Sequence, residues 1–175
     1  MLNIGSPSLR ARAWPPWRKF GANIMPGNME LNPDFKEFLQ SLNENEVRYL
    51  VVGGYAVAFH GHPRYTKDID LWIDLDEQNA EKAVKALEDF GFASLNLKPA
   101  DLLEPDTVIQ LGYPPRRIDL LIGLEGAAFD ECYTSRMEEE IDGIRVCFID
   151  RDNLARLKRA AGRPQDLADL DTLTK

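Results

Sequence analysis

The sequence has few cysteines and no long apolar run. Its 175 residues include two cysteines, Cys132 and Cys147, which form no CxxC pair and cannot build a disulfide framework. We therefore expect two buried or half-buried thiols in a reducing compartment, which predicts a cytoplasmic protein. No apolar stretch approaches the roughly 20 residues that a membrane-spanning helix needs, so a membrane partner is not predicted.

Residues 1–28 lack acidic residues, contain several prolines and show no helical or strand periodicity. This composition predicts a disordered or loosely ordered N-terminal extension. A secretory signal is not indicated, because no apolar segment follows the basic residues. Pro15-Pro16 would also break the amphipathic helix of a mitochondrial presequence. We expect residues 29–175 to form a single domain, since that length suits one hydrophobic core.

Acidic residues outnumber basic residues. There are 29 Asp and Glu against 21 Lys and Arg, which gives a net charge of −8. An acidic domain does not attract nucleic acid through its overall field, so RNA would need a local basic patch. One candidate patch lies near the C-terminus and consists of Arg151, Arg156, Lys158, Arg159 and Arg163.

Hydrophobic periodicity predicts an α/β (α+β) domain, with a mixed β-sheet core flanked by helices. Helices are expected over residues 34–42, 55–60, 77–90 and 150–161, and from residue 164 onward. Strands are expected over residues 48–52, 68–74, 107–111, 117–122, 138–141 and 144–149. The last two strands are joined by Asp142-Gly143, a strong hairpin turn signal.

In the final helix the leucines are expected to form one apolar side; they are Leu167, Leu170 and Leu173. Asp166 and Asp169 are three residues apart on the same helix, a spacing that is typical of a solvated face or a capping interaction.

Two carboxylates on one predicted strand form the first part of a candidate site. Side chains alternate between the faces of a strand, so Asp68 and Asp70 point the same way while Ile69 points to the core. Neighbouring carboxylates repel each other and are tolerated when a divalent cation neutralises them. Asp119 lies in a later apolar strand, where a carboxylate needs a partner. Together the three predict a catalytic site for two Mg²⁺ ions.

A glycine pair, Gly53-Gly54, ends one predicted strand and precedes a helix. A turn without side chains lets phosphate oxygens approach the backbone amides, and a helix N-terminus adds partial positive charge. A triphosphate would therefore lie between this turn and the metal ions. Arg64, Thr66 and Lys67 precede the acid pair and could contact the same phosphates; an ordinary basic loop and a strand cap are the alternatives.

The stretch from Val51 to Gly61, followed by Arg64-Tyr65-Thr66-Lys67-Asp68-Ile69-Asp70-Leu71, resembles the signature of the polymerase-β-like nucleotidyltransferase superfamily. That signature consists of a GG or GS turn, a gap, a D-x-D motif and a third Asp on another strand. Within the superfamily the sequence is most similar to the AbiEii-type toxins and related small nucleotidyltransferases. Residues 158–169 also match the ending of that group, a K-x3-G-R-x2-D-x2-D pattern.

The resemblance implies that the protein transfers a nucleoside monophosphate from an NTP, with Mg²⁺, to an acceptor hydroxyl. The acceptor would be a tRNA end in a toxin-like enzyme, or a hydroxyl of a partner protein in an antitoxin-like one. It also implies that Lys158 contacts the nucleotide and that Arg163 pairs with Asp166 or Asp169. The AbiEii-type toxins carry an added helical domain, which this sequence does not show.

The alternative function is a catalytically inactive, nucleotide-binding antitoxin or regulatory module, and the intact acid triad favours the enzyme. Three other residues have open roles. Arg117 shares the expected face of Asp119 and would counter the acids or hold a phosphate. Trp72 either packs against the sheet or stacks on a base. For His60 we expect packing or exposure, because no catalytic partner is indicated.

Overall fold

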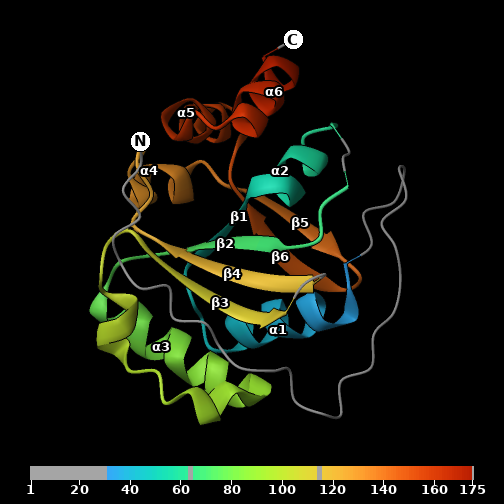
Figure 1. Ribbon diagram of the computed structural model, residues 1–175. Helices are drawn as coiled ribbons and strands as arrows, with labels where there is room; N and C mark the ends of the chain where they lie inside the picture. Colours follow the sequence, from blue (N-terminus) through green and yellow to red (C-terminus); the bar gives the residue numbers. More distant parts are fainter. Residues whose placement is uncertain (1–30, 63–64, 114–115, 175) are drawn as a thin grey trace.

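A six-stranded mixed sheet runs through the middle of the structure, which is a computed structural model that describes residues 31–62, 65–113 and 116–174 (Figure 1). The strands are β1 (Tyr49–Val52), β2 (Ile69–Ile73), β3 (Thr107–Tyr113), β4 (Arg116–Ile122), β5 (Met137–Ile141) and β6 (Ile144–Phe148). Their order across the sheet is β3-β4-β2-β1-β6-β5. The pairs β2–β4 and β1–β6 are parallel, and the other neighbours are antiparallel.

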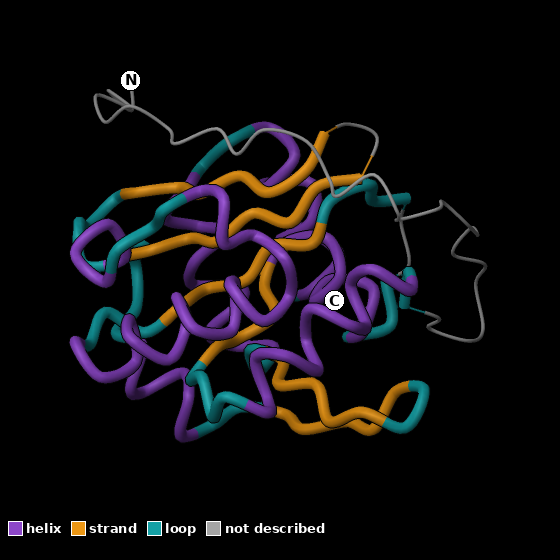
Figure 2. The backbone as a smooth tube through the Cα atoms, turned by 90° about the horizontal axis from the view of Figure 1, so that it is seen from below, coloured by secondary structure: helices purple, strands orange, loops and turns teal. Residues whose placement is uncertain are grey.

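Helices cover both faces of the sheet. They are α1 (Pro33–Glu44), α2 (Gly53–Phe59), α3 (Glu77–Leu87), α4 (Phe129–Thr134), α5 (Arg151–Ala161) and α6 (Pro164–Leu173). In Figure 1, α1 and α3 lie below the sheet, whereas α2, α5 and α6 lie above it. Figure 2, seen from below, shows helices lying across the strands. The mixed sheet and its helical layers confirm the expected fold class.

Local sequence signals set the ends of the helices. The Asn32 side chain accepts a hydrogen bond from the Asp34 amide at 2.9 Å and caps α1, whose first residue is Pro33. Asp150 caps α5 in the same way, accepting from the Asn153 amide at 3.0 Å. Gly162 ends α5 with a positive φ of 62°. The chain can therefore turn back sharply into α6.

The site-forming elements differ slightly from the expected boundaries. Helix α2 begins at Gly53 rather than at Tyr55, so both glycines lie inside its first turn. Strand β2 begins at Ile69, and Asp68 is the residue just before it. The hairpin around Asp142-Gly143 is confirmed as β5–β6. The short helix α4 was not expected, because its six residues are too few to show a clear helical period.

The orientation of α6 overturns the expected apolar side. Leu167 is 50% exposed, whereas Asp166 and Asp169 are buried, with exposed fractions of 2% and 4%. Of the three leucines, Leu173 is buried in the core. The helix is turned so that its acids meet a cation on α5.

Among the described residues, no helix is long and apolar enough to cross a membrane.

Candidate active site

The sheet register places two of the predicted catalytic acids side by side. Asp70 on β2 pairs with Asp119 on the parallel neighbour β4, and on its other side it pairs with Val52 at the end of β1. Directly paired residues project from the same face of a sheet. The three central strands therefore bring the glycine turn and both acids to one end of the upper face, beneath α2 (Figure 1).

Gly53 lies directly against the Asp70 carboxylate. Its φ is +61°, a conformation that residues with a Cβ rarely adopt. A Cβ added at this position would lie 2.7 Å from the Asp70 Cγ, and closer still to the Oδ2 oxygen. Glycine is thus required for two reasons: the backbone has a positive φ, and the Asp70 carboxylate leaves no room for a Cβ. The result is a side-chain-free cradle around the carboxylate.

Arg117 holds two of the three acids. Its Nε donates to Asp119 Oδ1 at 2.6 Å, and its Nη2 donates to Asp119 Oδ2 at 2.8 Å. The same Nη2 lies 3.2 Å from Asp68 Oδ2. Of the two roles that the sequence left open, the structure thus gives Arg117 that of counter-ion to the acids.

The acids repel one another in a partly dry environment. Burial, followed by the negative charges of Asp119 and Asp68, raises the pKa of Asp70 to about 7. Burial also raises the pKa of Asp68, against the opposing effect of Arg117. The positive charges of Lys158 and Arg163 lower the pKa of Asp70. The site therefore carries excess negative charge at its centre, which a cation would relieve.

The donor set suits a divalent cation, although it is not preassembled. Among the described residues, no three His, Cys, Asp or Glu side chains form a ready metal centre. The Arg117 guanidinium engages Asp68 and Asp119 instead. Carboxylate oxygens gathered at one place are nevertheless the ligands that Mg²⁺ prefers, and Gly53 presents no side chain to the Asp70 carboxylate.

The residues expected to contact phosphate have different environments. Arg64 lies outside the described residues. The Thr66 hydroxyl donates to the Asp68 carbonyl oxygen at 3.1 Å, so it braces the loop just before β2. Lys67 is exposed, and its ammonium lies 5.9 Å from the centre of the Tyr65 ring. Gly54 is buried within α2. Lys67 is the described cation nearest in sequence to the acid pair.

Lys158 is buried rather than open to solvent. Its ammonium lies 2.7 Å from Asp169 Oδ2 and 3.1 Å from Asp166 Oδ1. The expected pairing of Arg163 is confirmed, because its Nε donates to Asp166 Oδ2 at 2.6 Å. The expectation that the two acids are solvated is wrong, since a buried ammonium requires buried counter-charges.

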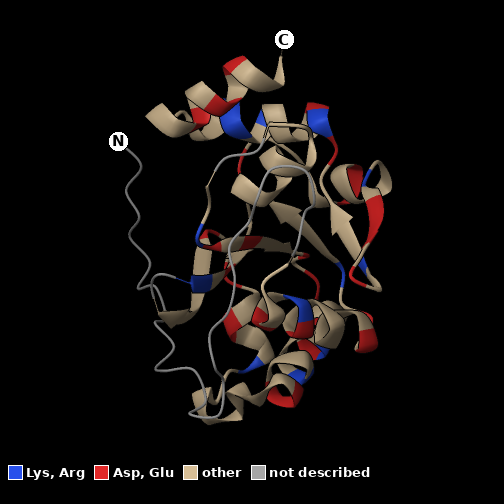
Figure 3. Cartoon of the chain, turned by 90° about the vertical axis from the view of Figure 1, so that its right-hand side faces the viewer, with Lys and Arg blue, Asp and Glu red and all other residues tan. Residues whose placement is uncertain are grey.

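The expected basic patch does not form one open surface. Besides the two cations just described, Arg151 donates through Nε to the Leu173 carbonyl oxygen at 2.6 Å. Arg156 lies 3.4 Å from Glu131 Oε2. Figure 3 shows Lys and Arg interspersed with Asp and Glu. Internal partners thus engage most members of the patch, while its four arginines remain exposed.

The two remaining open roles are structural. Trp72 is buried, and its ring meets Phe129 edge-on at 5.1 Å, which favours packing over base stacking. The His60 Nε2 lies 2.8 Å from the Ile149 carbonyl oxygen, as expected for a packing residue.

The sequence interpretation missed Gln110, which lies opposite Asp119 in the register of β3 and β4. A polar residue inside an apolar strand was the signal that could have identified it.

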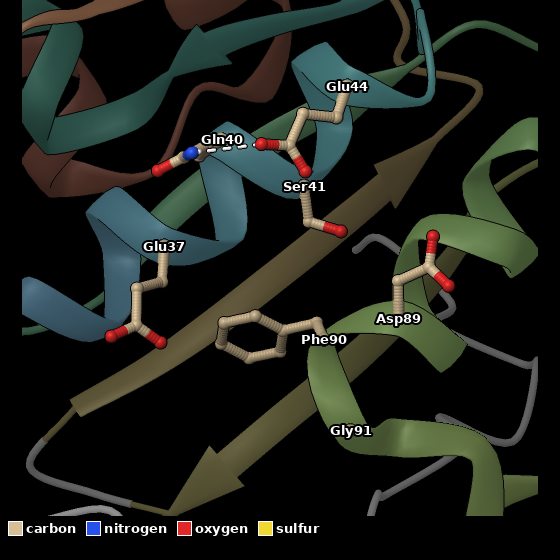
Figure 4. Close-up of a pocket in the computed structure, with 7 residues that line it drawn as sticks. All are labelled: Glu37, Gln40, Ser41, Glu44, Asp89, Phe90 and Gly91. Carbon is tan, nitrogen blue, oxygen red and sulfur yellow. Dashed lines mark hydrogen bonds between the residues drawn. The ribbon is translucent and has the colours of Figure 1, made fainter.

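A hollow of about 340 Å³ lies away from the acids, between α1 and the residues that follow α3 (Figure 4). The described residues that line it are Glu37, Gln40, Ser41, Glu44, Asp89, Phe90 and Gly91. Figure 4 shows the acids around its rim and a hydrogen bond from Gln40 to Glu44. Neither Lys nor Arg is among these residues, so the hollow does not suit a triphosphate.

Solved structures with a similar arrangement are nucleotidyltransferases. The lincosamide antibiotic adenylyltransferase LnuA, in its lincomycin-bound form, matches with a TM-score of 0.50 and 16% identity, over 85% of this chain and 99% of its own. A candidate nucleotidyltransferase from Thermotoga maritima matches with a TM-score of 0.54 and 14% identity, over 83% and 95% of the two chains. At these identities the likeness concerns the fold, which is that of a nucleotidyltransferase.

The sequence pattern of one family, described as "Nucleotidyltransferase of unknown function (DUF6036)", matches residues 29–174. The chain belongs to this family and is a nucleotidyltransferase. The matched range includes the glycine pair, the three acids and Lys158. No curated protein is significantly similar to the sequence. The superfamily resemblance seen in the sequence is thereby confirmed.

Proposed function

We propose that the protein transfers a nucleoside monophosphate from an NTP to an acceptor hydroxyl, with Asp68, Asp70 and Asp119 as its catalytic acids. One observation carries this proposal: Asp70 and Asp119 lie side by side on parallel strands, with the Gly53 turn against Asp70. Paired acids beside a side-chain-free turn can serve a polyphosphate, whose charge needs cations and whose oxygens need open backbone.

Two Mg²⁺ ions are the proposed cofactors, held by the same three carboxylates. When bound there, the metal would neutralise the charge that the acids and the phosphates share. Asp119 would position the acceptor hydroxyl for in-line attack at the α-phosphate, and pyrophosphate would leave. Arg117 would release part of its hold on Asp68 and Asp119 as the nucleotide and its cations arrive.

The cradle of Gly53 and Gly54 would face the triphosphate. Thr66 would keep the loop before β2 in place through its bond to the Asp68 carbonyl oxygen. Lys67 is exposed and free to turn toward phosphate oxygens from its place beside Asp68. We assign Arg64 the same role from its place in the sequence motif.

The acceptor proposed here is a hydroxyl of a small molecule or of a partner protein. The net charge of −8 and the engagement of the C-terminal arginines by internal partners disfavour a polyanionic tRNA. LnuA is named for adenylyl transfer to lincosamide antibiotics, and it shares this fold. A cognate toxin would be the partner protein if the chain acts as an antitoxin in an AbiEii-like pair.

A transfer assay tests the proposal. The protein would be incubated with Mg²⁺ and each α-³²P-labelled NTP, together with tRNA, a lysate or a panel of small hydroxyl compounds. We expect label on a protein or small molecule, lost in Asp68→Asn and kept in Asp171→Asn, a matched change at an exposed position on α6. Label on tRNA would replace the acceptor assignment. Retained transfer in Asp68→Asn would overturn the catalytic one.

A binding assay separates the enzyme from an inactive nucleotide-binding module. If ATP binds with Mg²⁺, yet no acceptor is labelled and no pyrophosphate is released, the module is the better description. The three intact acids favour the enzyme, since binding alone does not need all of them.

A further inference from the structure

A cluster of four charged side chains joins α5 to α6. Lys158 is 5% exposed, and it contacts Asp166 and Asp169, which are 2% and 4% exposed. Arg163 approaches the same Asp166 from the surface, where 72% of its side chain is exposed. Gln165 completes the arrangement by donating to Asp169 Oδ1 at 3.0 Å. The cluster is neutral as a whole and well bonded.

Stability alone is a poor explanation for this cluster. A buried ion pair is often no more stabilising than apolar residues of the same size. Here α6 leaves Leu167 half exposed while it buries two acids. The two acids, rather than Leu167, therefore face the cation on α5.

The cluster lies close to the acid site. Lys158 lies on α5, which packs against α2, the helix that begins at Gly53 (Figure 1). Its charge and that of Arg163 act on Asp70, the acid next to that glycine. The two acids of the cluster lie on α6, the outermost of these helices in Figure 1. Both cations of the cluster are thus near enough to the acid site for their charges to act on Asp70.

The two acids of the cluster do not use all the hydrogen-bond donors of Lys158. An ammonium carries three N–H donors, and the described residues take up two of them. A phosphate oxygen could accept the third without breaking the cluster. Because both acids hold the ammonium, little side-chain freedom is lost when a ligand binds.

We propose that Asp166 and Asp169 are positioning residues that hold Lys158, together with Arg163, toward the phosphate groups of the nucleotide. This inference rests on the proposed function and deepens it. Helix α6 then belongs to the nucleotide site, although it contributes none of the catalytic acids. Asp169 sets the direction of the ammonium, and Asp166 links it to the exposed guanidinium of Arg163.

The test compares binding of ATP and of adenosine by calorimetry, in the presence of Mg²⁺. Asp169→Asn should weaken ATP about tenfold or more, because a hydrogen bond to a charged group loses its alignment. Adenosine, which has no phosphate, should bind as it does to the natural chain. Arg163→Gln should weaken ATP binding in the same selective way, and it should leave the fold intact because the Arg163 side chain is exposed. Asp171→Asn, on the exposed side of the same helix, should change neither ligand.

Lys158→Arg keeps the charge and serves as the conservative variant. It should retain most of the ATP affinity that Lys158→Met loses. If Asp169→Asn and Arg163→Gln fold and bind ATP as tightly as the natural chain, the cluster is only a structural link and the inference fails. If the natural chain binds neither ATP nor another NTP, the proposed function fails with it. NTP binding by the natural chain therefore distinguishes a failure of this inference from a failure of the proposed function.

Discussion

The carboxylate of Asp70 occupies the space in which a side chain on Gly53 would lie. The contact joins the end of β1 to β2, and it makes the glycine turn and the acid a single unit. Any residue with a Cβ at position 53 must move the acid or the backbone. Gly53 and Asp70 can approach each other this closely only because Gly53 has no side chain.

Gly53→Ala is therefore expected to impair transfer severely. Displacing a catalytic group by about 1 Å can cost about 100-fold in rate. Gly143→Ala is the matched control, since Gly143 also has a positive φ, of 79°, but nothing lies within 4 Å of its added Cβ. Gly143→Ala should lose about 1 kcal/mol of stability to backbone strain, and Gly53→Ala should lose more, because its Cβ also meets the Asp70 carboxylate. Equal kcat/KM values in the two variants would contradict the role of the contact.

Asp70→Asn should make the metal-free protein more stable and inactive. Folding raises the pKa of Asp70 to about 7, above the ordinary value near 4. Between these values the unfolded chain has released this proton while the folded chain still holds it. The natural protein therefore loses stability as the pH rises through this window.

Thermal unfolding in EDTA checks the sign of this change in stability with pH. The variant and the natural chain should melt at similar temperatures near pH 4, and the variant should gain about 2–4 kcal/mol by pH 8. Asp171→Asn supplies the control for an exposed acid on α6. A stability difference that stays constant across this range would show that the Asp70 charge is not costly.

Arg117→Gln should make the fold depend more strongly on divalent cations. Arg117 is the internal partner of Asp68 and Asp119, so its removal leaves their repulsion uncompensated. We expect a loss of about 1.5–3 kcal/mol without metal, and a larger rise in melting temperature with Mg²⁺ than in the natural chain. Arg145→Gln is the control, because Arg145 is 60% exposed on β6. Identical Mg²⁺ responses in both variants would show that Arg117 does not compete with the cation.

Lys158→Met should destabilise the protein by about 3–5 kcal/mol, because it leaves two buried carboxylates without their cation. Lys85→Met is the matched change at the surface, where Lys85 pairs with Asp89 in an exposed i,i+4 bridge. It should cost less than about 1 kcal/mol. Urea unfolding measures both, and a similar midpoint for the two variants would mean that the buried cluster contributes little.

Much of the site was predictable from the chain because its signals are local. Alternation along residues 68–73 placed Asp68 and Asp70 on one face without knowledge of the neighbouring strands. Asp119 was conspicuous because an acid inside an apolar strand needs a partner.

Other features depended on contacts that no local pattern contains. The leucines of α6 predicted the wrong inward side, because the helix faces Lys158 rather than an apolar surface. The C-terminal arginines resembled a nucleic-acid patch in the sequence. Their partners Glu131 and the Leu173 carbonyl oxygen lie 25 and 22 residues away, and only the folded chain shows these pairs.

The sequence by itself determined the class of fold, the acid triad and the glycine turn, because each depends on periodicity or spacing within a short segment. Tertiary structure decided which of these pieces meet. It set Asp70 beside Asp119 through the parallel pairing of β2 with β4, and it set Gly53 against Asp70. It also gave Lys158 its two acids, since the stability of a buried charge depends on the partners that folding brings to it.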